Sequence, residues 1–189
     1  KLENKKKIIT MPVITKNKFD QKIHEVEIDY KNFKIEKYLR LIEHSYKKSS
    51  YFELYYDKIK KIFNKHHVYL AKINHDLIVE ICFLLKINTK FYNASSIQID
   101  SNLKKIELLN EICEKKNCTQ YISTYGASSY LDNLKKFPNS DIKINYFSYD
   151  NKKYNQIGNE FISNLSILDL LFNEGPNSIE IIRNNFKIF

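Results

Sequence analysis

Residues 121–130 place small polar side chains where α/β proteins often carry a ligand-binding loop. Their sequence, YISTYGASSY, indicates a strand that passes through Ser, Gly and Ala residues into a helix. Such a junction attracts ligands, because the free amides at a helix N-terminus point toward the strand ends and favour anions. Ser123, Tyr125, Gly126 and Tyr130 are therefore candidate ligand-binding residues. A polar turn with a serine cap would account for the same residues.

A second group of candidates begins with Tyr154 and Gln156 and continues into residues 166–175, SILDLLFNEG, which contain Asp169 and Asn173. The local pattern describes a well-capped helix, with Ser166 and Asp169 as an N-cap pair and the last glycine as the C-cap. Taken by itself, the pattern describes a well-made helix and assigns no chemistry to these residues.

Motifs for metal, phosphate-loop or serine-hydrolase chemistry are absent from the sequence. It has no Gly-rich phosphate loop and no GxSxG elbow, and its 5 histidines do not join Cys or acidic residues at zinc-ligand spacing. The 3 cysteines, Cys82, Cys113 and Cys118, also lack metal-ligand spacing. We expect them to be reduced thiols, with Cys82 and Cys113 on apolar helix faces. The sequence therefore predicts neither a metal nor another cofactor.

The chain has 189 residues, of which 31 are basic and 22 acidic, for a net charge of +9. Only Arg40 and Arg183 are arginines, so the guanidinium fork that reads phosphates and guanine is nearly missing. Lysines are spread along the chain, and we do not expect nucleic acid as a partner. No apolar run reaches the roughly eighteen residues of a membrane helix, and no signal peptide is visible. We therefore expect a cytoplasmic protein without a membrane span.

The hydrophobic pattern predicts a single α/β domain over residues 1–189. Strands are expected at residues 8–13, 23–28, 90–93, 119–122 and 142–149. Helices are expected at about residues 33–46, after Ser50, at 77–86, after Ser101, and at 128–137, 165–172 and 177–184. Ser50 and Glu53 form a capping-box pair, and Ser101 is a cap for the helix after it. Strands separated by helices favour a layered sheet, flanked by helices, with at least partly parallel pairing.

Several segments, taken in order, resemble the WbqC-like proteins, a bacterial family associated with O-antigen and other surface-polysaccharide loci. The closing signature of that family resembles YISTYGASSYL at residues 121–131, YNQ at 154–156 and FISNLSILDLLFNEG at 161–175. Further upstream, IITMPV at 8–13, SYKKSSYFELYYDKI at 45–59 and ICEKKNCTQYIS at 112–123 resemble other family segments. The resemblance thus covers almost the whole chain, and its specificity comes from the order of motifs that are individually weak.

The chain departs from the family pattern at two places. The family has Ser-Gly where this chain has Ser123 and Thr124. It also opens with a strand and a segment like H-x-P-x-Y-x-P-W, to which nothing here corresponds. The resemblance therefore implies a domain that lacks the N-terminal part, with a first strand position that is empty or filled by a partner.

The resemblance implies an enzyme of surface-glycan and nucleotide-sugar biosynthesis that transfers an acyl or aminoacyl group to the amine of an amino sugar. Its partners would be a nucleotide-linked amino sugar and an acyl or aminoacyl donor. A non-catalytic binding or scaffold protein of the same pathway, and a tRNA- or nucleic-acid-binding protein, remain as alternatives.

Acyl transfer needs a group that takes the amine proton and donors that stabilise the oxyanion. The resemblance then makes Asp169 and Ser123 the candidate catalytic residues. The candidate substrate-binding residues are Tyr125, Gly126, Tyr130, Tyr154, Gln156 and Asn173. Five of these residues are expected to converge on one cleft, because strand ends and helix N-termini collect at one edge of an α/β sheet: Ser123, Gly126, Tyr154, Gln156 and Asp169.

Overall fold

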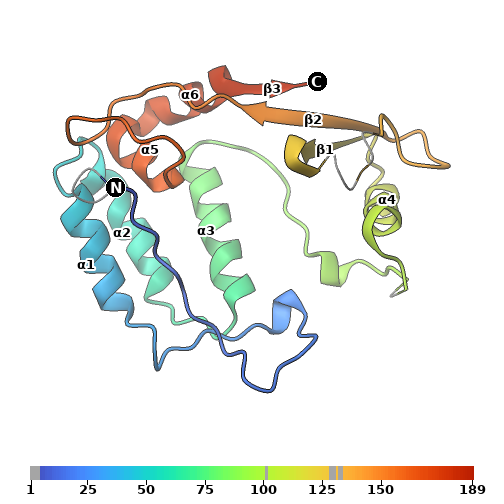
Figure 1. Cartoon of the computed structure of the whole chain (residues 1–189), viewed down its shortest axis with the longest axis horizontal. Coiled ribbons are helices and arrows are strands. Elements are labelled where there is room, and N and C mark those ends of the chain that lie inside the picture. Colours follow the sequence, from blue (N-terminus) through green and yellow to red (C-terminus); the bar gives the residue numbers. More distant parts are fainter. Residues whose placement is uncertain (1–4, 101, 128–130, 132–133) are drawn as a thin grey trace. The chain divides into compact units, whose positions relative to one another are not determined.

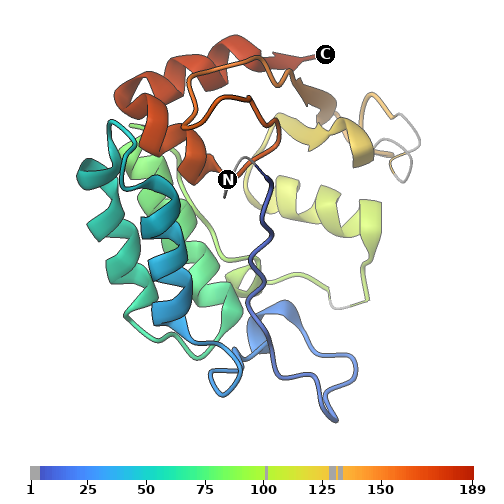
Figure 2. The ribbon, with the colours of Figure 1, turned by 60° about the vertical axis from the view of Figure 1, so that its left-hand side comes forward.

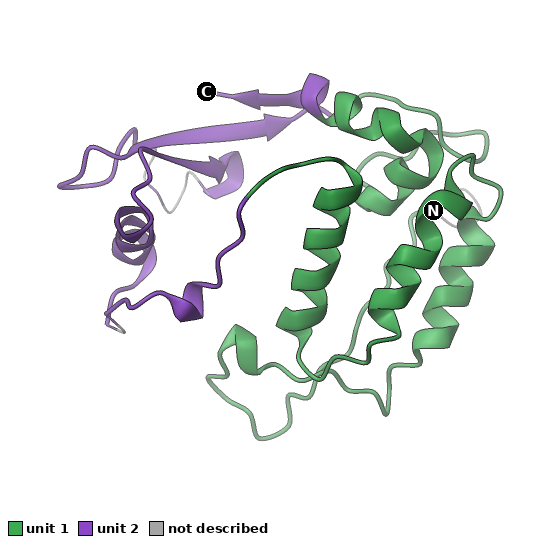
Figure 3. Ribbon diagram, turned by 180° about the vertical axis from the view of Figure 1, so that it is seen from behind, with its two compact units in different colours: residues 1–89, 151–182 green, residues 90–150, 183–189 purple. Residues whose placement is uncertain are grey.

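The computed structural model describes residues 5–100, 102–127, 131 and 134–189. The chain divides into two compact units, each built from segments that are distant in the sequence (Figure 3). Unit 1 contains Lys1–Thr89 and Asn151–Ile182, and unit 2 contains Lys90–Asp150 and Arg183–Phe189.

Unit 1 is helical. Its helices are α1 (Ile35–Tyr46), α2 (Phe52–Phe63), α3 (Leu70–Leu84), α5 (Ile167–Glu174) and the first part of α6 (Ser178–Asn185), with 3-10 turns at Ile23–Glu25 and Gly175–Asn177. Helices α1, α2 and α3 lie side by side in a row (Figure 1). Helix α5 lies across the ends of these helices at which α1 finishes and α2 starts. The apolar residues of α1 recur at helical spacing and therefore form one buried stripe.

The core of unit 1 has two parts. One part joins the end of α1 and the start of α2 to α5, where Leu171 and Phe172 are fully buried. The other joins the start of α1 to the end of α2 and the start of α3, around Ile62 and Ile73. Removing a side chain such as Phe172 would cost about 3–5 kcal/mol, because the cavity left behind refills only partly.

Unit 2 contains a three-stranded sheet of order β1-β2-β3, formed by β1 (Gln120–Thr124), β2 (Lys143–Tyr149) and β3 (Phe186–Ile188). Strands β1 and β2 are parallel, whereas β2 and β3 are antiparallel. Helix α4 (Lys105–Lys115) contributes Cys113 to the core under the sheet, and the 3-10 turns Ala94–Ser96 and Tyr125–Ala127 complete the described elements. A mixed α/β structure with a partly parallel sheet was predicted, and this prediction is confirmed.

Three predicted strands are wrong. Residues 8–13 and 23–28 form only isolated bridges, between Val13 and Ile28 and between Glu27 and Tyr69, and residues 23–25 are a 3-10 turn. Residues 90–93 are irregular. These β-rich stretches have no continuous neighbouring strand to pair with, and an unpaired strand leaves its backbone groups unsatisfied.

The predicted helix starts also needed correction. Helix α2 has Tyr51 at its N-cap without a side-chain cap, so the Ser50–Glu53 pair does not form as a capping box. Helix α4 begins only at Lys105, and Ser101 lies outside the described residues. Of the helix expected at 128–137, residues 134–137 are not helical, and residues 128–130 and 132–133 are not described.

None of the described helices combines the length and hydrophobicity that crossing a lipid bilayer demands.

Candidate functional site

Asp169 lies in the first turn of α5 and is fully buried. Ser166 caps this helix, because its side-chain oxygen accepts a hydrogen bond from the amide of Leu168 at 3.3 Å. Of the predicted N-cap pair, Ser166 therefore acts as a cap and Asp169 does not. The carboxyl group of Asp169 does not return to the cap but accepts a hydrogen bond from the hydroxyl of Tyr154 at 2.7 Å on Oδ2.

A second tyrosine, Tyr46 at the end of α1, also faces Asp169. Burial first, and the negative charge of Asp169 second, raise the pKa of Tyr46 far above its ordinary value. The phenol is therefore neutral at every physiological pH. The other carboxyl oxygen of Asp169, Oδ1, is buried and accepts no well-formed hydrogen bond from any residue that the structure describes. Buried polar atoms in folded proteins are nearly always hydrogen-bonded, so this oxygen is an exception that calls for an explanation.

The loop that brings Tyr154 to Asp169 is held by side-chain amides. Gln156 both donates to the carbonyl and accepts from the amide of Ile162, each at 2.9 Å. Asn173 accepts from the amide of Ile157 at 3.2 Å and donates to the carbonyl of Asp169 at 2.7 Å. These bonds give Gln156 and Asn173 a structural task, while their predicted contact with a substrate stays a prediction.

Glu174 completes this arrangement at the end of α5. It is nearly buried, and its Oε1 accepts a hydrogen bond from the amide of Asn155 at 2.7 Å. The three residues of the YNQ segment are thus each tied to residues of the 161–175 segment. The two closing motifs form one folded assembly within unit 1.

A cavity of about 370 Å³ opens beside this assembly, along α1. We call it the α1 cavity. It is lined by Lys6, Lys7, Ile9, Met11, Phe33, Tyr38, Leu41, Ile42, Ser45, Tyr46, Phe63, Leu77, Asn164, Leu165, Ser166 and Leu168, all of which belong to unit 1. Tyr46 lines the cavity and also faces Asp169, so it connects the cavity with the buried carboxyl group.

This arrangement suits the movement of a proton. The hydroxyl oxygen of Tyr46 can take a proton from a group in the cavity as its own proton moves to Asp169. Tyr154 keeps Asp169 in place from the other side by donating to Oδ2. Asp169 cannot itself touch a molecule in the cavity, because its side chain is fully buried.

The other predicted site residues lie in unit 2. Ser123 is buried in β1, opposite Tyr146 of the parallel strand β2. Tyr125 and Gly126 follow in the 3-10 turn after β1, where the ring of Tyr125 is exposed and lies 5.7 Å from that of Phe189. Tyr130 lies outside the described residues. The catalytic role of Ser123 and the binding roles of these residues stay predictions.

The structure places Tyr154, Gln156, Asn173 and Asp169 together, and it places Ser123, Tyr125 and Gly126 together, but in different units. Strands β1 and β2 are parallel neighbours, as the prediction of one common cleft required. The convergence of the two groups stays a prediction.

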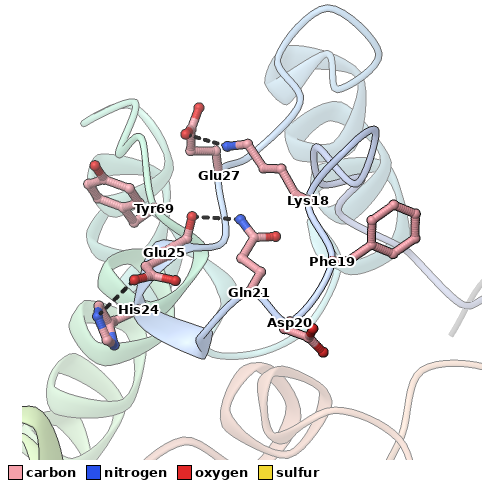
Figure 4. Close-up of a pocket in the computed structure, with 8 residues that line it drawn as sticks. All are labelled: Lys18, Phe19, Asp20, Gln21, His24, Glu25, Glu27 and Tyr69. Atoms are coloured by element: carbon pink, nitrogen blue, oxygen red, sulfur yellow. Dashed lines mark hydrogen bonds and ion pairs between the residues drawn. The ribbon is translucent and has the colours of Figure 1, made fainter.

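A second hollow, of about 530 Å³, lies on the loop around the Ile23–Glu25 turn (Figure 4). Several of its side chains contact one another, since Lys18 pairs with Glu27 at 2.6 Å and His24 lies 3.7 Å from Glu25. The ring of Phe19 points away from Tyr69. Among the described residues, no three His, Cys, Asp or Glu side chains gather to hold a metal ion in either hollow or elsewhere.

Comparison with known proteins places this arrangement in a family. The model of the WbqC-like protein family matches residues 1–181, which include both closing motifs. The chain belongs to the WbqC-like protein family. It is similar to the uncharacterized protein Rv1507c of Mycobacterium tuberculosis (strain ATCC 25618 / H37Rv), with 32% identity over 177 residues, 93% of this chain and 75% of that protein. No solved structure matches the chain.

Sequence reasoning missed two residues of the site in this WbqC-like protein. Tyr46 was assigned to the apolar stripe of α1, where it does lie, and helical spacing gives no sign of a polar partner across the unit. Glu174 directly precedes the helix-ending glycine, and no local pattern marks it as part of a site. Both belong to segments that carry the family resemblance, at 45–59 and 161–175, and that was the available signal.

Proposed function

We propose that this WbqC-like protein is an enzyme of surface-glycan and nucleotide-sugar biosynthesis that transfers an acyl or aminoacyl group to the amine of an amino sugar. The observation that carries the proposal is the position of Tyr46. Tyr46 lines the α1 cavity, and its neutral phenol interacts with the buried carboxyl group of Asp169.

The reaction assigned to this site forms one bond and breaks one. The amine nitrogen of the sugar attacks the carbonyl carbon of the donor, a C–N bond forms, and the bond from that carbon to the donor's leaving group breaks. The proton lost by the amine passes to the oxygen of Tyr46 while the phenol proton moves to Oδ1 of Asp169. The same path in reverse returns a proton to the leaving group.

The ionisation of Tyr46 supports this assignment. A phenol with a raised pKa does not lose its proton to water near neutral pH, so it keeps the proton that it passes to Asp169 as the amine proton arrives. Asp169 then orients the phenol in the resting enzyme, as a positioning residue that does not touch the substrate.

A non-catalytic binding or scaffold protein of the same pathway is the second candidate. It is favoured by the loop contacts, because Gln156 and Asn173 use their amides to hold the fold. Under this alternative the buried carboxyl group fixes the position of α5 and of the loop before it, and transfers no proton.

The test compares Tyr46→Phe with the matched variant Tyr55→Phe, which removes the hydroxyl of another buried tyrosine in the same core. Each is mixed with nucleotide-linked amino sugars and a panel of acyl thioesters and aminoacyl donors, and products are followed by mass spectrometry. We expect Tyr46→Phe to lower kcat by about 100-fold or more, the usual worth of a proton-transferring group. Tyr55→Phe should keep its activity.

Asp169→Asn tests the same proton transfer. The amide oxygen of the variant still accepts a hydrogen bond from Tyr154, but the amide cannot take a proton from Tyr46. Its activity should fall with that of Tyr46→Phe while circular dichroism stays unchanged. If all variants turned over substrate at the same rate, the proposed proton transfer through Tyr46 would be wrong. Sugar binding by calorimetry without turnover of any donor would favour the scaffold alternative.

A further inference from the structure

The α1 cavity has one polar end and one apolar end. Its lining residues on α1 are Tyr38, Leu41, Ile42, Ser45 and Tyr46, which share one face of the helix. Ser45 lies seven residues after Tyr38, so the two are about 10 Å apart along the helix axis. The cavity is therefore elongated along α1, and its two ends meet different side chains.

The apolar end lies near the start of α1. It is lined by Phe33, which belongs to the core cluster around Ile62 and Ile73, and by Tyr38, Phe63, Leu77 and Met11, which pack against that cluster. Apolar walls hold water poorly, since a buried water needs polar partners. Space of this kind is suited to a hydrocarbon chain.

The polar end lies near the end of α1 and the start of α5. Its polar lining residues are Tyr46, Ser166, Asn164, and Lys6 and Lys7 of the N-terminal segment, while Leu165 and Leu168 line it beside Ser166. That segment runs along the helices toward the Ile23–Glu25 turn (Figures 1 and 2). Met11 packs against the cluster at the apolar end, and Lys6 and Lys7 precede it in an irregular, non-helical stretch, which directs them toward the other end.

The charge of the polar end selects an anion. Lys6 and Lys7 are both exposed cations, and none of the residues that line the cavity is acidic. The positive end of the α5 dipole lies at the same place, next to Ser166. A carboxylate or phosphate would therefore be attracted here, whereas a cationic group would be repelled.

We propose that the α1 cavity binds a linear, medium-length acyl chain with an anionic head group, the chain toward Phe33 and Phe63 and the head group at Lys6 and Lys7. The inference rests on the proposed function in one respect: such a molecule is the acyl donor of the proposed transfer. It narrows the donor to an aliphatic acyl compound and places the reacting carbonyl group at Tyr46.

The experiment measures binding without transfer, so that it can succeed where the proposed reaction fails. Isothermal titration calorimetry with the full chain would compare acetate, hexanoate, octanoate, decanoate and decyl phosphate with decyltrimethylammonium. We expect affinity to rise about tenfold for each two carbons added up to decanoate, because each buried methylene adds a similar increment. Decyl phosphate should bind at least as well as decanoate, and decyltrimethylammonium at least tenfold more weakly.

Two variants localise the binding. Leu41→Trp fills the middle of the cavity and should weaken decanoate binding at least tenfold, and Ser45→Leu, a smaller change, tests the same point if Leu41→Trp does not fold. Lys6→Glu with Lys7→Glu should weaken decanoate binding similarly. Lys47→Glu with Lys48→Glu is the matched control, because both lysines are exposed beyond the end of α1 and do not line the cavity.

Decanoate that binds no better than acetate would overturn the proposal. So would decanoate binding that is equal in all folded variants, since the chain would then bind at another surface. If decyltrimethylammonium bound as tightly as decanoate, the proposed preference for an anionic head group would be wrong. Decanoate binding as expected, with no acyl transfer to any sugar, would keep this inference and reject the proposed function.

Discussion

At the scale of single residues, the Asp169 site combines a fully buried carboxyl group with two tyrosines. One carboxyl oxygen accepts a hydrogen bond from Tyr154, and the other accepts no well-formed hydrogen bond from a described residue. Replacing such a group by a similar apolar side chain often stabilises a protein, so its presence calls for a reason beyond stability. The proposed movement of a proton through Tyr46 supplies one.

The cysteines give a prediction at the same scale. All three are unbridged, as predicted from the sequence, and only Cys118 is exposed. Burial, with the neighbouring Cys118 as the second cause, raises the pKa of Cys113 to about 11. Because the thiolate is the reacting form, Cys118 should be modified first by a thiol reagent at pH 7–8 and Cys113 last.

Peptide mapping by mass spectrometry after timed labelling would give that order. Unfolding in denaturant without reductant should expose all three thiols at similar rates. Labelling of Cys113 before Cys118 in the folded protein would contradict the burial of the α4 face.

At the scale of elements, one glycine fixes how α5 joins the residues that follow. Gly175 has a positive φ of 56°, and a Cβ at this position would overlap the ring of Tyr51. The amide of Tyr51 in turn donates to the carbonyl of Phe172 at 3.0 Å. Helix α5, which carries Asp169, is therefore fitted closely against the start of α2.

Gly175→Ala should lower the free energy of unfolding by about 2–4 kcal/mol, from backbone strain at positive φ and overlap with an aromatic ring. Gly126→Ala is the matched control, because an added Cβ at Gly126 meets nothing within 4 Å. That variant should stay within about 0.5 kcal/mol of the parent protein. Urea unfolding followed by circular dichroism measures both, and equal stability of the two variants would argue against the close fit at Tyr51.

Some helices and strands could be predicted from sequence patterns, and others could not. Helix α1 and strand β2 were predicted near their observed positions, because each has a periodic apolar face that can be read locally. The runs at 8–13 and 23–28 have strand-like composition, but they lack a neighbouring strand. Whether a strand forms depends on its partner, and local composition does not contain that information.

At the scale of the molecule, the stability of unit 1 should depend on pH through Asp76 of α3. Its carboxyl oxygens contact Lys65 at 2.9 Å, Lys72 and His67 at 3.0 Å, and His75 at 3.5 Å. The hydrogen bond from Lys65 is the main reason that the pKa of Asp76 lies well below its ordinary value. A carboxyl pKa lowered by folding adds stability above the unfolded pKa, near 4, and this contribution is lost as the pH falls below it.

Asp76→Asn should therefore lower the free energy of unfolding by about 1–2 kcal/mol at pH 7, a modest value because the two lysines are largely exposed. The difference from the parent protein should shrink steadily below about pH 4. Asp57→Asn, on the exposed face of α2, is the control and should change little. Urea unfolding from pH 3 to pH 7 gives both curves, and a difference that does not vary with pH would exclude Asp76 as the source.

The sequence by itself determined the mixed α/β class, the helices with strong apolar stripes, the unbridged cysteines and, through the ordered motifs, the family. These properties depend on local spacing and composition, which folding does not alter. Only the tertiary structure decided that the Asp169 carboxyl group turns away from its cap toward Tyr154 and Tyr46. It also decided that residues 186–188 pair with β2 and that Lys6 and Lys7 line the α1 cavity. Each of these contacts joins residues far apart in the chain, and its formation depends on how the intervening segments pack rather than on the residues beside it.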